Sequence, residues 1–231
     1  MAVALDAKSG WTTSHNAVTS WTDASFTVGV GSNRVLLIGL VTEATSGSPP
    51  TAPTANWDST GTNQSMLLLH TQTDTGNAQI SSFLFGLVAP TSGLKTLSVA
   101  GLTATTDSMA CYIAFTGADQ TGGVTTFKNA TGSFVSSGLT VTESPAANSG
   151  DAVIGLFGGN DGTPTVNQTA WAPATLTTAA VDFWISNYAL ATGTMAMTMT
   201  QGSSTHCNGN AVAINQVSAG LTLNDQQAFL M

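Results

Sequence analysis

Four segments of the chain are apolar at nearly every position, and this feature limits the available folds more than any other. They span residues 35–41, 80–89, 109–115 and 151–159. A strand with water on one face alternates apolar and polar residues, whereas a continuous apolar run is typical of a strand covered on both faces. In a sandwich of two sheets each strand hides only one face. We therefore expect these four strands to need extra cover, either from the chain's own loops or from other subunits.

Other segments alternate with the period of a half-buried β-strand. Alternation occurs at residues 26–30, 97–99, 139–141 and 195–199. In the last of these, Met195, Met197 and Met199 share one face, which predicts a core stripe rather than a ligand set. Turn-forming residues punctuate the chain at strand-length spacings, and helical periodicity is almost absent. The pattern predicts an all-β fold, an antiparallel sandwich of two sheets, with no sequence repeat and no composition shift to divide it.

The charge content excludes several classes of partner. Charged residues make up 7% of the chain, and the 4 Lys and Arg residues against 12 Asp and Glu give a net charge of -8. Nucleic-acid binding and binding to anionic membranes both need many cations, so we expect neither. The first residues lack a basic start followed by an apolar core, so we expect no secretory signal. Arg34, one of the four cations, is expected to hold neighbouring carbonyls or a carboxylate at a strand end.

No residue pattern indicates catalysis. The three histidines lie in dissimilar segments, and no nucleophile motif or paired-carboxylate arrangement stands out. We therefore expect no enzyme activity, no cofactor and no metal site. Cys111 and Cys207 are the only cysteines. They could pair, but Cys111 lies in an apolar strand, where a buried free thiol is common.

Five segments, taken in order, resemble a family of β-sandwich domains found in phage virion structural proteins and in some bacterial surface proteins. They read FTVGVGSNRVLLIGLVTEA, SSFLFGLVAPTSGLKTLSVAG, CYIAFTGADQTGGV, SGDAVIGLFGG and NAVAIN, and lie between residues 25 and 215. The family pattern has a Gly-Ser-Asn-Arg turn before a long apolar strand. This chain departs from the pattern after Pro53, where NWDSTGTNQSM replaces a Gly-Gly turn. The resemblance implies a jelly-roll, lectin-like sandwich and no catalytic residues.

Two sets of residues are candidates for contacts with other molecules. Trp57, Asp58 and Trp171 lie in polar, loop-like surroundings, where an exposed indole could stack on a sugar ring. The C-terminal residues are unusually apolar for a chain end, and four of them are candidates for contacts between subunits: Leu221, Leu223, Phe229 and Leu230. We expect three regions: an N-terminal segment (1–24), a β-sandwich domain (25–216) and a C-terminal tail (217–231), with both ends as candidate inter-subunit segments.

The leading hypothesis is a viral, specifically phage, structural protein that acts by protein–protein packing. Capsid decoration or cementing is the expected role, or another head- or tail-associated position in the virion, with assembly in the host cytoplasm. The expected partners are copies of the chain itself, with a homotrimer favoured, and the major capsid protein or other virion proteins. The alternative hypothesis is a carbohydrate- or receptor-binding module of a tail fibre or surface adhesin, with glycans as partners.

Overall fold

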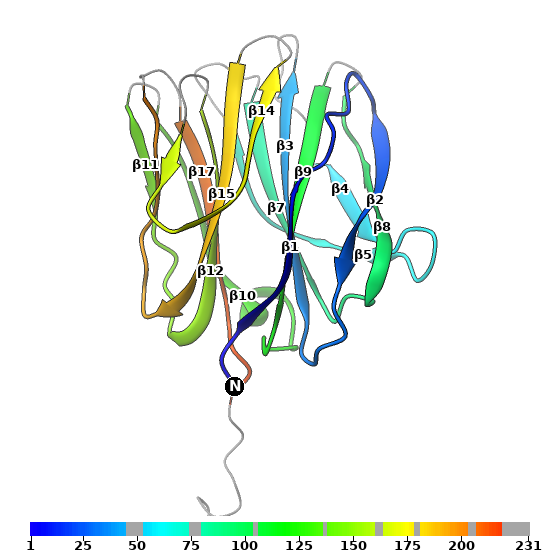
Figure 1. Ribbon diagram of the computed structural model, residues 1–231, viewed down its shortest axis with the longest axis vertical. Helices are drawn as coiled ribbons and strands as arrows, with labels where there is room; N and C mark the ends of the chain where they lie inside the picture. Colours follow the sequence, from blue (N-terminus) through cyan, green and yellow to red (C-terminus); the bar gives the residue numbers. More distant parts are fainter. Residues whose placement is uncertain are drawn as a thin grey trace, which may run out of the picture.

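The chain forms an all-β protein of four antiparallel sheets that stack as successive layers (Figure 1). The computed structural model describes residues 1–44, 53–73, 80–103, 106–135, 138–159, 164–177, 181–202 and 207–218, and at 44, 106, 172–177 and 181–185 the backbone alone. The all-β, antiparallel prediction is confirmed. The prediction of two sheets is wrong, because the described residues form four.

The first half of the chain forms one inner and one outer sheet. The inner sheet contains, in spatial order, β1 (Ala4–Trp11), β9 (Thr106–Thr116), β3 (Val35–Ala44), β7 (Ile80–Val88) and β6 (Leu67–Thr73). The outer sheet contains β2 (Ser20–Val28), β8 (Gly93–Ala100), β4 (Thr54–Trp57) and β5 (Gln64–Ser65). Each neighbouring pair of strands is antiparallel, as short connections between successive strands require.

The second half repeats this arrangement. A single helical turn, α1 (Gly123–Thr126), leads into it. The inner sheet contains β10 (Phe127–Val135), β17 (Cys207–Ile214), β12 (Ser149–Gly159), β15 (Val181–Thr192) and β14 (Thr169–Thr177). The outer sheet contains β11 (Thr140–Glu143), β16 (Met197–Thr200) and β13 (Thr165–Val166). In both halves the first strand pairs with the last, the last with the third, and the second with the next-to-last. The structure therefore contains an internal repeat that the sequence did not indicate.

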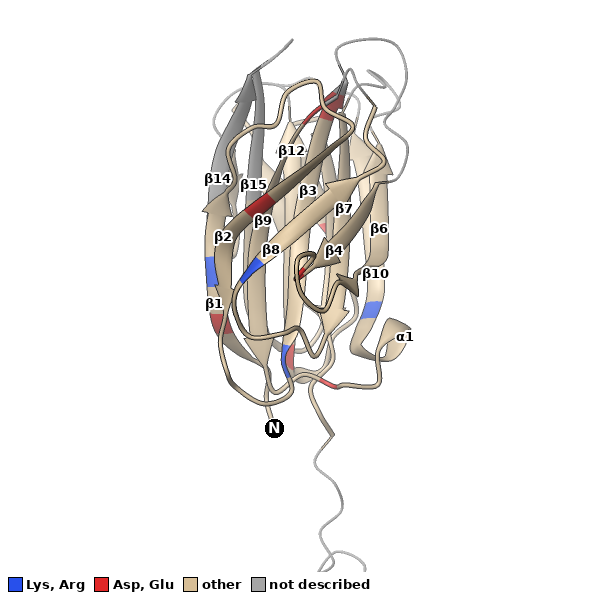
Figure 2. Ribbon diagram, turned by 90° about the vertical axis from the view of Figure 1, so that its right-hand side faces the viewer, with Lys and Arg blue, Asp and Glu red and all other residues tan. Residues whose placement is uncertain are grey.

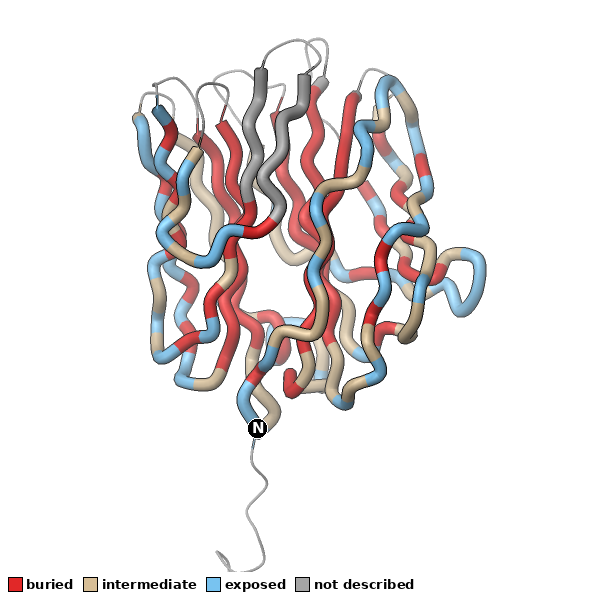
Figure 3. The backbone as a smooth tube through the Cα atoms, viewed as in Figure 1, coloured by how far each residue is buried: buried red, intermediate tan, exposed pale blue. Residues whose placement is uncertain are grey.

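Three apolar layers lie between the four sheets. The middle layer joins the two inner sheets, with Leu37 and Ile113 from one half facing Ile154 and Val212 from the other. The two outer layers lie between each inner sheet and its own outer sheet. The tube in Figure 3 shows buried residues concentrated along the central strands. The four apolar segments form β3, β7, β9 and β12, which all belong to the inner sheets. The extra cover that they need comes from the chain's own outer sheets.

The inner sheets approach closely where side chains are absent. A Cβ atom at Gly39 of β3 would lie 3.1 Å from Cδ1 of Leu156 on β12 and 3.0 Å from Sγ of Cys111. Such distances are shorter than ordinary carbon contacts, so glycine at this position lets Leu156 pack directly on the opposite backbone. Close packing in the middle layer therefore requires glycine at position 39 in one inner sheet and a large side chain, Leu156, opposite it in the other.

Several local predictions can be compared with the structure. Met197 and Met199 are fully buried between the second inner and outer sheets, with Met195 packed beside them, so the core stripe is confirmed. Arg34 donates hydrogen bonds to the carbonyls of Gly31 (2.6 Å) and Pro90 (3.1 and 3.2 Å), as expected. The boundary expected at residue 25 falls within β2, and residues 4–11 pair with β9 of the same chain. Within the described part of the chain, no helix has the length and apolarity to cross a membrane.

Both cysteines are free thiols buried in different apolar layers. Burial raises the pKa of Cys111 to about 12 and that of Cys207 to about 11. Since the thiolate is the reactive form, neither thiol should react with an aromatic disulfide reagent at pH ~8 in the native protein, and both should react after unfolding. A thiol assay with and without denaturant measures this. One equivalent of rapid native reactivity would contradict the described burial.

Candidate interaction groove

The two halves meet along two seams, one at each edge of the facing inner sheets. Because the halves are related by the repeat, the seams are built from equivalent strands: β1 lies against β14 on one side, and β10 lies against β6 on the other. Edge strands carry unpaired backbone groups and are natural places for contacts with other chains. The two seams nevertheless differ in packing. Side chains fill one of them, which we call the closed seam, and leave a groove along the other, which we call the open seam.

The closed seam is filled by Trp171. This side chain comes from β14, is buried in the middle layer, and donates its Nε1–H to the Ser9 carbonyl of β1 at 2.6 Å. Close by, the Lys8 ammonium lies 5.0 Å from the centre of the Tyr188 ring, a cation–π distance. Trp171 therefore joins the two halves and offers no free ring face to a sugar.

The pair Trp57 and Asp58 is also used by the fold. Trp57 is fully buried in the outer layer of the first half, where it makes T-shaped ring contacts with Phe26 and Tyr112. Its Nε1–H donates to the Thr91 carbonyl at 3.0 Å. The carbohydrate-binding hypothesis needed an exposed indole at Trp57 or Trp171. The structure buries both, so neither supplies a stacking surface.

Asp58 fixes the turn between β4 and β5. Its Oδ2 accepts hydrogen bonds from the backbone N–H (3.1 Å) and hydroxyl (2.9 Å) of Thr62 and from the Thr91 hydroxyl (3.2 Å). Lys95 Nζ lies 3.4 Å from the same oxygen. The Thr62 backbone N–H, more than its hydroxyl or Lys95, lowers the pKa of the Asp58 carboxyl by stabilising its charged form. Oδ2 of this carboxylate is thus engaged by the turn and by two residues around β8, Thr91 and Lys95.

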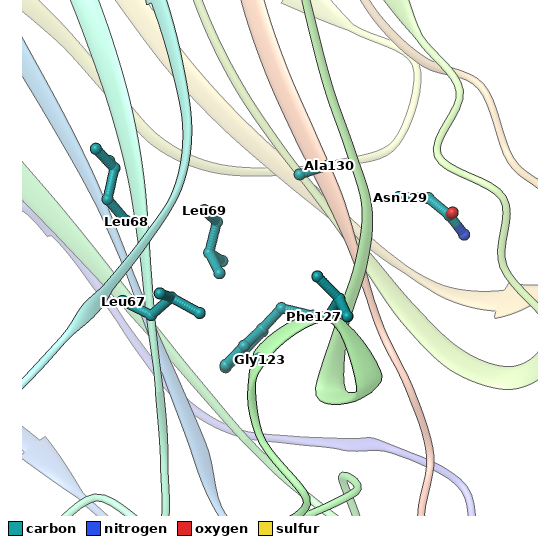
Figure 4. Close-up of a pocket in the computed structure, with 8 residues that line it drawn as sticks. Leu67, Leu68, Leu69, Gly123, Phe127, Asn129 and Ala130 are labelled. Carbon is teal, nitrogen blue, oxygen red and sulfur yellow. The ribbon is translucent and has the colours of Figure 1, made fainter.

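The open seam contains an apolar groove, shown in Figure 4 and located at the β6–β10–α1 edge of Figure 2. Its volume is about 430 Å³. We call it the seam groove, and it is lined by Leu67, Leu68, Leu69, Gly123, Val124, Phe127, Asn129 and Ala130. Two of the apolar side chains in this lining are exposed, Leu67 by 47% and Val124 by 85%. Apolar surface that faces water beside a concave apolar wall is typical of a contact site.

Local chain geometry builds both walls of the groove. A register shift in the β6–β7 pairing falls between Leu68 and His70, so β6 is irregular where it borders the groove. A Cβ atom at Gly86 of β7 would lie 2.8 Å from Phe127 Cζ and 2.9 Å from Leu69 Cδ1. The glycine therefore lets Phe127 and Leu69 meet over β7 as the groove floor.

The helical turn α1 forms the groove's outer lip. It is held by Thr126, whose hydroxyl donates to the Asp119 carbonyl (2.9 Å) and accepts from the Gly122 N–H (2.8 Å). This turn carries the exposed Val124. Asn129 of β10, labelled in Figure 4, donates its side-chain N–H to the Ala146 carbonyl at 2.7 Å. The fixed polar groups are thus engaged within the protein, which leaves an apolar lining for a partner.

The sequence did not indicate this groove, because its walls come from β6 and from α1–β10, far apart along the chain. Only the Leu67-Leu68-Leu69 run was a visible signal. The predicted contact residues Leu221, Leu223, Phe229 and Leu230 lie outside the described residues. Among the described residues, no three His, Cys, Asp or Glu side chains gather as metal ligands would.

No protein-family model matches the chain, and no curated protein is significantly similar to it.

Replacing Asp58 with Asn should flatten the acid side of the stability profile. A carboxyl whose folded pKa is lowered contributes stability above its unfolded pKa of 3.8, and the contribution is lost as the pH falls through the folded pKa. Melting temperatures of both proteins between neutral pH and pH ~3 measure this. The wild type should lose its advantage over Asp58→Asn in the acid range, and parallel curves throughout would refute the role given to this carboxylate.

Trp171→Phe should destabilise the protein by about 1 kcal/mol, since it keeps most of the packing and loses the hydrogen bond to Ser9. Trp171→Ala should cost about 3–5 kcal/mol, because it also empties the closed seam. Urea unfolding monitored by circular dichroism gives both values. If Trp171→Ala were as stable as the wild type, this side chain would not join the halves.

Proposed function

We propose that this protein is a phage virion structural protein that works by protein–protein packing, as capsid decoration or cement or in another head- or tail-associated position. The observation that carries the proposal is the seam groove with its exposed Leu67 and Val124. Each Å² of apolar surface removed from water contributes about 25 cal/mol, so a partner that fills the groove gains free energy without any charged contact. In this proposal the protein is no enzyme and needs no cofactor.

The four strands that are apolar on both faces do not support the proposal. They were expected to need cover from loops or from other subunits, but the chain's own outer sheets cover them. The argument for association therefore moves from the strand faces to the seam between the halves. This change also makes the expected contact smaller and more specific, because one groove replaces a set of whole sheet faces.

The strand order supports a jelly-roll type for each half. A jelly roll has eight strands in two four-stranded sheets, in which the first strand neighbours the last and the second neighbours the next-to-last. The orders β1-β9-β3-β7 and β2-β8-β4-β5 follow this rule, with β6 as an added edge strand. The orders β10-β17-β12-β15 and β11-β16-β13 follow it with one outer strand fewer. Jelly rolls are common in viral capsids, so this topology favours the virion hypothesis.

The surface chemistry agrees with contacts between uncharged faces. All four cations have partners within the chain: Lys8 the Tyr188 ring, Arg34 two carbonyls, Lys95 Asp58 and Lys128 Asp151. On the outer sheet of the second half, Thr hydroxyls pair across strands, Thr142 with Thr198 at 2.9 Å. Neutral faces of this kind can be brought together without the large desolvation cost of buried charges. A second copy, in a closed ring with a trimer favoured, and other virion proteins are the proposed partners.

Charges placed in the groove should prevent association. The double variant Leu67→Asp/Val124→Asp should require at least ~10-fold more protein for half-association than the wild type, a loss of about 1.4 kcal/mol or more. Light scattering coupled to size-exclusion chromatography over a range of concentrations measures this. The matched control is Leu94→Asp/Leu139→Asp, which adds the same charge at exposed leucines outside the groove. A wild type that stays monomeric throughout, or equal losses in both variants, would overturn the proposal.

A further inference from the structure

The chain passes the base of the seam groove just before its described end. The Asn215 N–H donates to the Thr126 carbonyl of α1 at 2.8 Å. The chain then turns away from the groove: Gln216 bridges to Ala118, and the Val217 N–H donates to the Gly117 carbonyl at 2.9 Å, just after β9. The Met1 ammonium in turn donates to the Val217 carbonyl at 3.1 Å. The C-terminal segment, residues 219–231, therefore starts on the β1–β9 side of this end of the molecule.

The composition of that segment matches the groove. Leu221 and Leu223 flank Thr222 with the period of a β-strand, so an extended segment would place both leucines on one face. Phe229 and Leu230 add a second apolar pair, and the segment contains no cation and one acid, Asp225. A segment with two leucines on one face, and with its single acid outside that leucine pair, suits an apolar groove whose exposed walls are Leu67 and Val124.

We propose that the seam groove binds the C-terminal segment, residues 219–231, of a neighbouring copy of this chain, with Leu221 and Leu223 entering the groove. This inference rests on the proposed function and names the partner of the same site. The proposal pairs the apolar C-terminal residues, which need a binding surface, with the apolar groove, which needs an occupant.

Chain length favours a neighbour over the chain's own segment. In the inner sheet β9 and β6 are three strand positions apart, about 14 Å at roughly 4.8 Å per strand. Leu221 is four residue steps beyond Val217, and a fully extended chain covers only about 14 Å over four steps. A segment of the same chain would have to cross in a straight line with no residue left to turn into the groove. A neighbour's segment has no such limit.

The backbone beside the groove can add a strand. Among the described strands β6 pairs only with β7, and β10 pairs only with β17. Each therefore has an edge whose N–H and C=O groups can pair with an extended peptide, as in recognition by strand addition. The contact joins a tail on one copy to a groove on the next, so it is heterologous, and repetition closes a ring such as a trimer when the rotation permits.

Cross-linking between two variants of the full chain tests the inference. Val124→Cys is made in one preparation and Leu223→Cys in a second, which carries a mass tag, and the two are mixed and mildly oxidised. Val124 is exposed at the groove, whereas the native thiols are buried and do not compete. A tagged heterodimer on a non-reducing gel should form at least about ten times more than from the matched mixture of Leu94→Cys with Leu223→Cys, because docking raises the local thiol concentration.

Other outcomes separate this inference from the proposed function. An internal cross-link in the single-chain Val124→Cys/Leu223→Cys variant, without heterodimer, would place the segment in its own groove and overturn the inference. If Leu221→Asp/Leu223→Asp assembles like the wild type while Leu67→Asp/Val124→Asp does not, the groove is an interface with another occupant, and only the inference fails. If the wild type never associates, the proposed function fails first. Loss of assembly in both variants, together with the heterodimer, supports both.

Discussion

The structure depends on the packing of two inner sheets against each other within one chain. Both sheets are apolar on both faces, so neither can face water, and each also needs a cover on its outer side. Four layers are the result, with the two outer sheets drawn from the same halves as the inner ones. Because the middle layer takes residues from both halves, removing one half would leave the other half's inner sheet with an apolar face in water, although each half would keep its own outer layer. We therefore expect the two halves to stabilise each other.

Sequence reasoning recovered the parts of this fold that are local. The continuous apolar runs marked the inner strands, the alternating Met residues marked a core face, and Arg34 was correctly assigned to neighbouring carbonyls. The number of layers was not local information, because a run of apolar residues shows that two faces are covered without showing what covers them. The repeat was hidden since equivalent strands share topology but not side chains. Thus Trp171 closes one seam, while Leu67 and Val124 border an open groove at the other.

Misassigned aromatic residues show where such reasoning reaches its limit. The polar residues that surround Trp57 and Trp171 in the sequence predict exposed indoles. Trp57 lies in the short outer strand β4 and Trp171 in the edge strand β14. Thr54 and Thr169 of these strands are exposed, whereas both indoles are buried. Each indole N–H then needs an acceptor inside the protein, and a backbone carbonyl supplies it. Alternation over two or three residues is too short to separate such a strand from a loop.

The hydrogen bond between Met1 and Val217 holds the beginning of the chain and the residues that follow β17 together at one pole of the molecule (Figure 1). Polypeptide that continues in either direction would leave from this same pole. Copies tethered to a surface through either end would therefore all stand in one orientation, with the opposite pole outward. A label or cargo fused to Met1 would report on the attached side and leave the outward-facing side unobstructed.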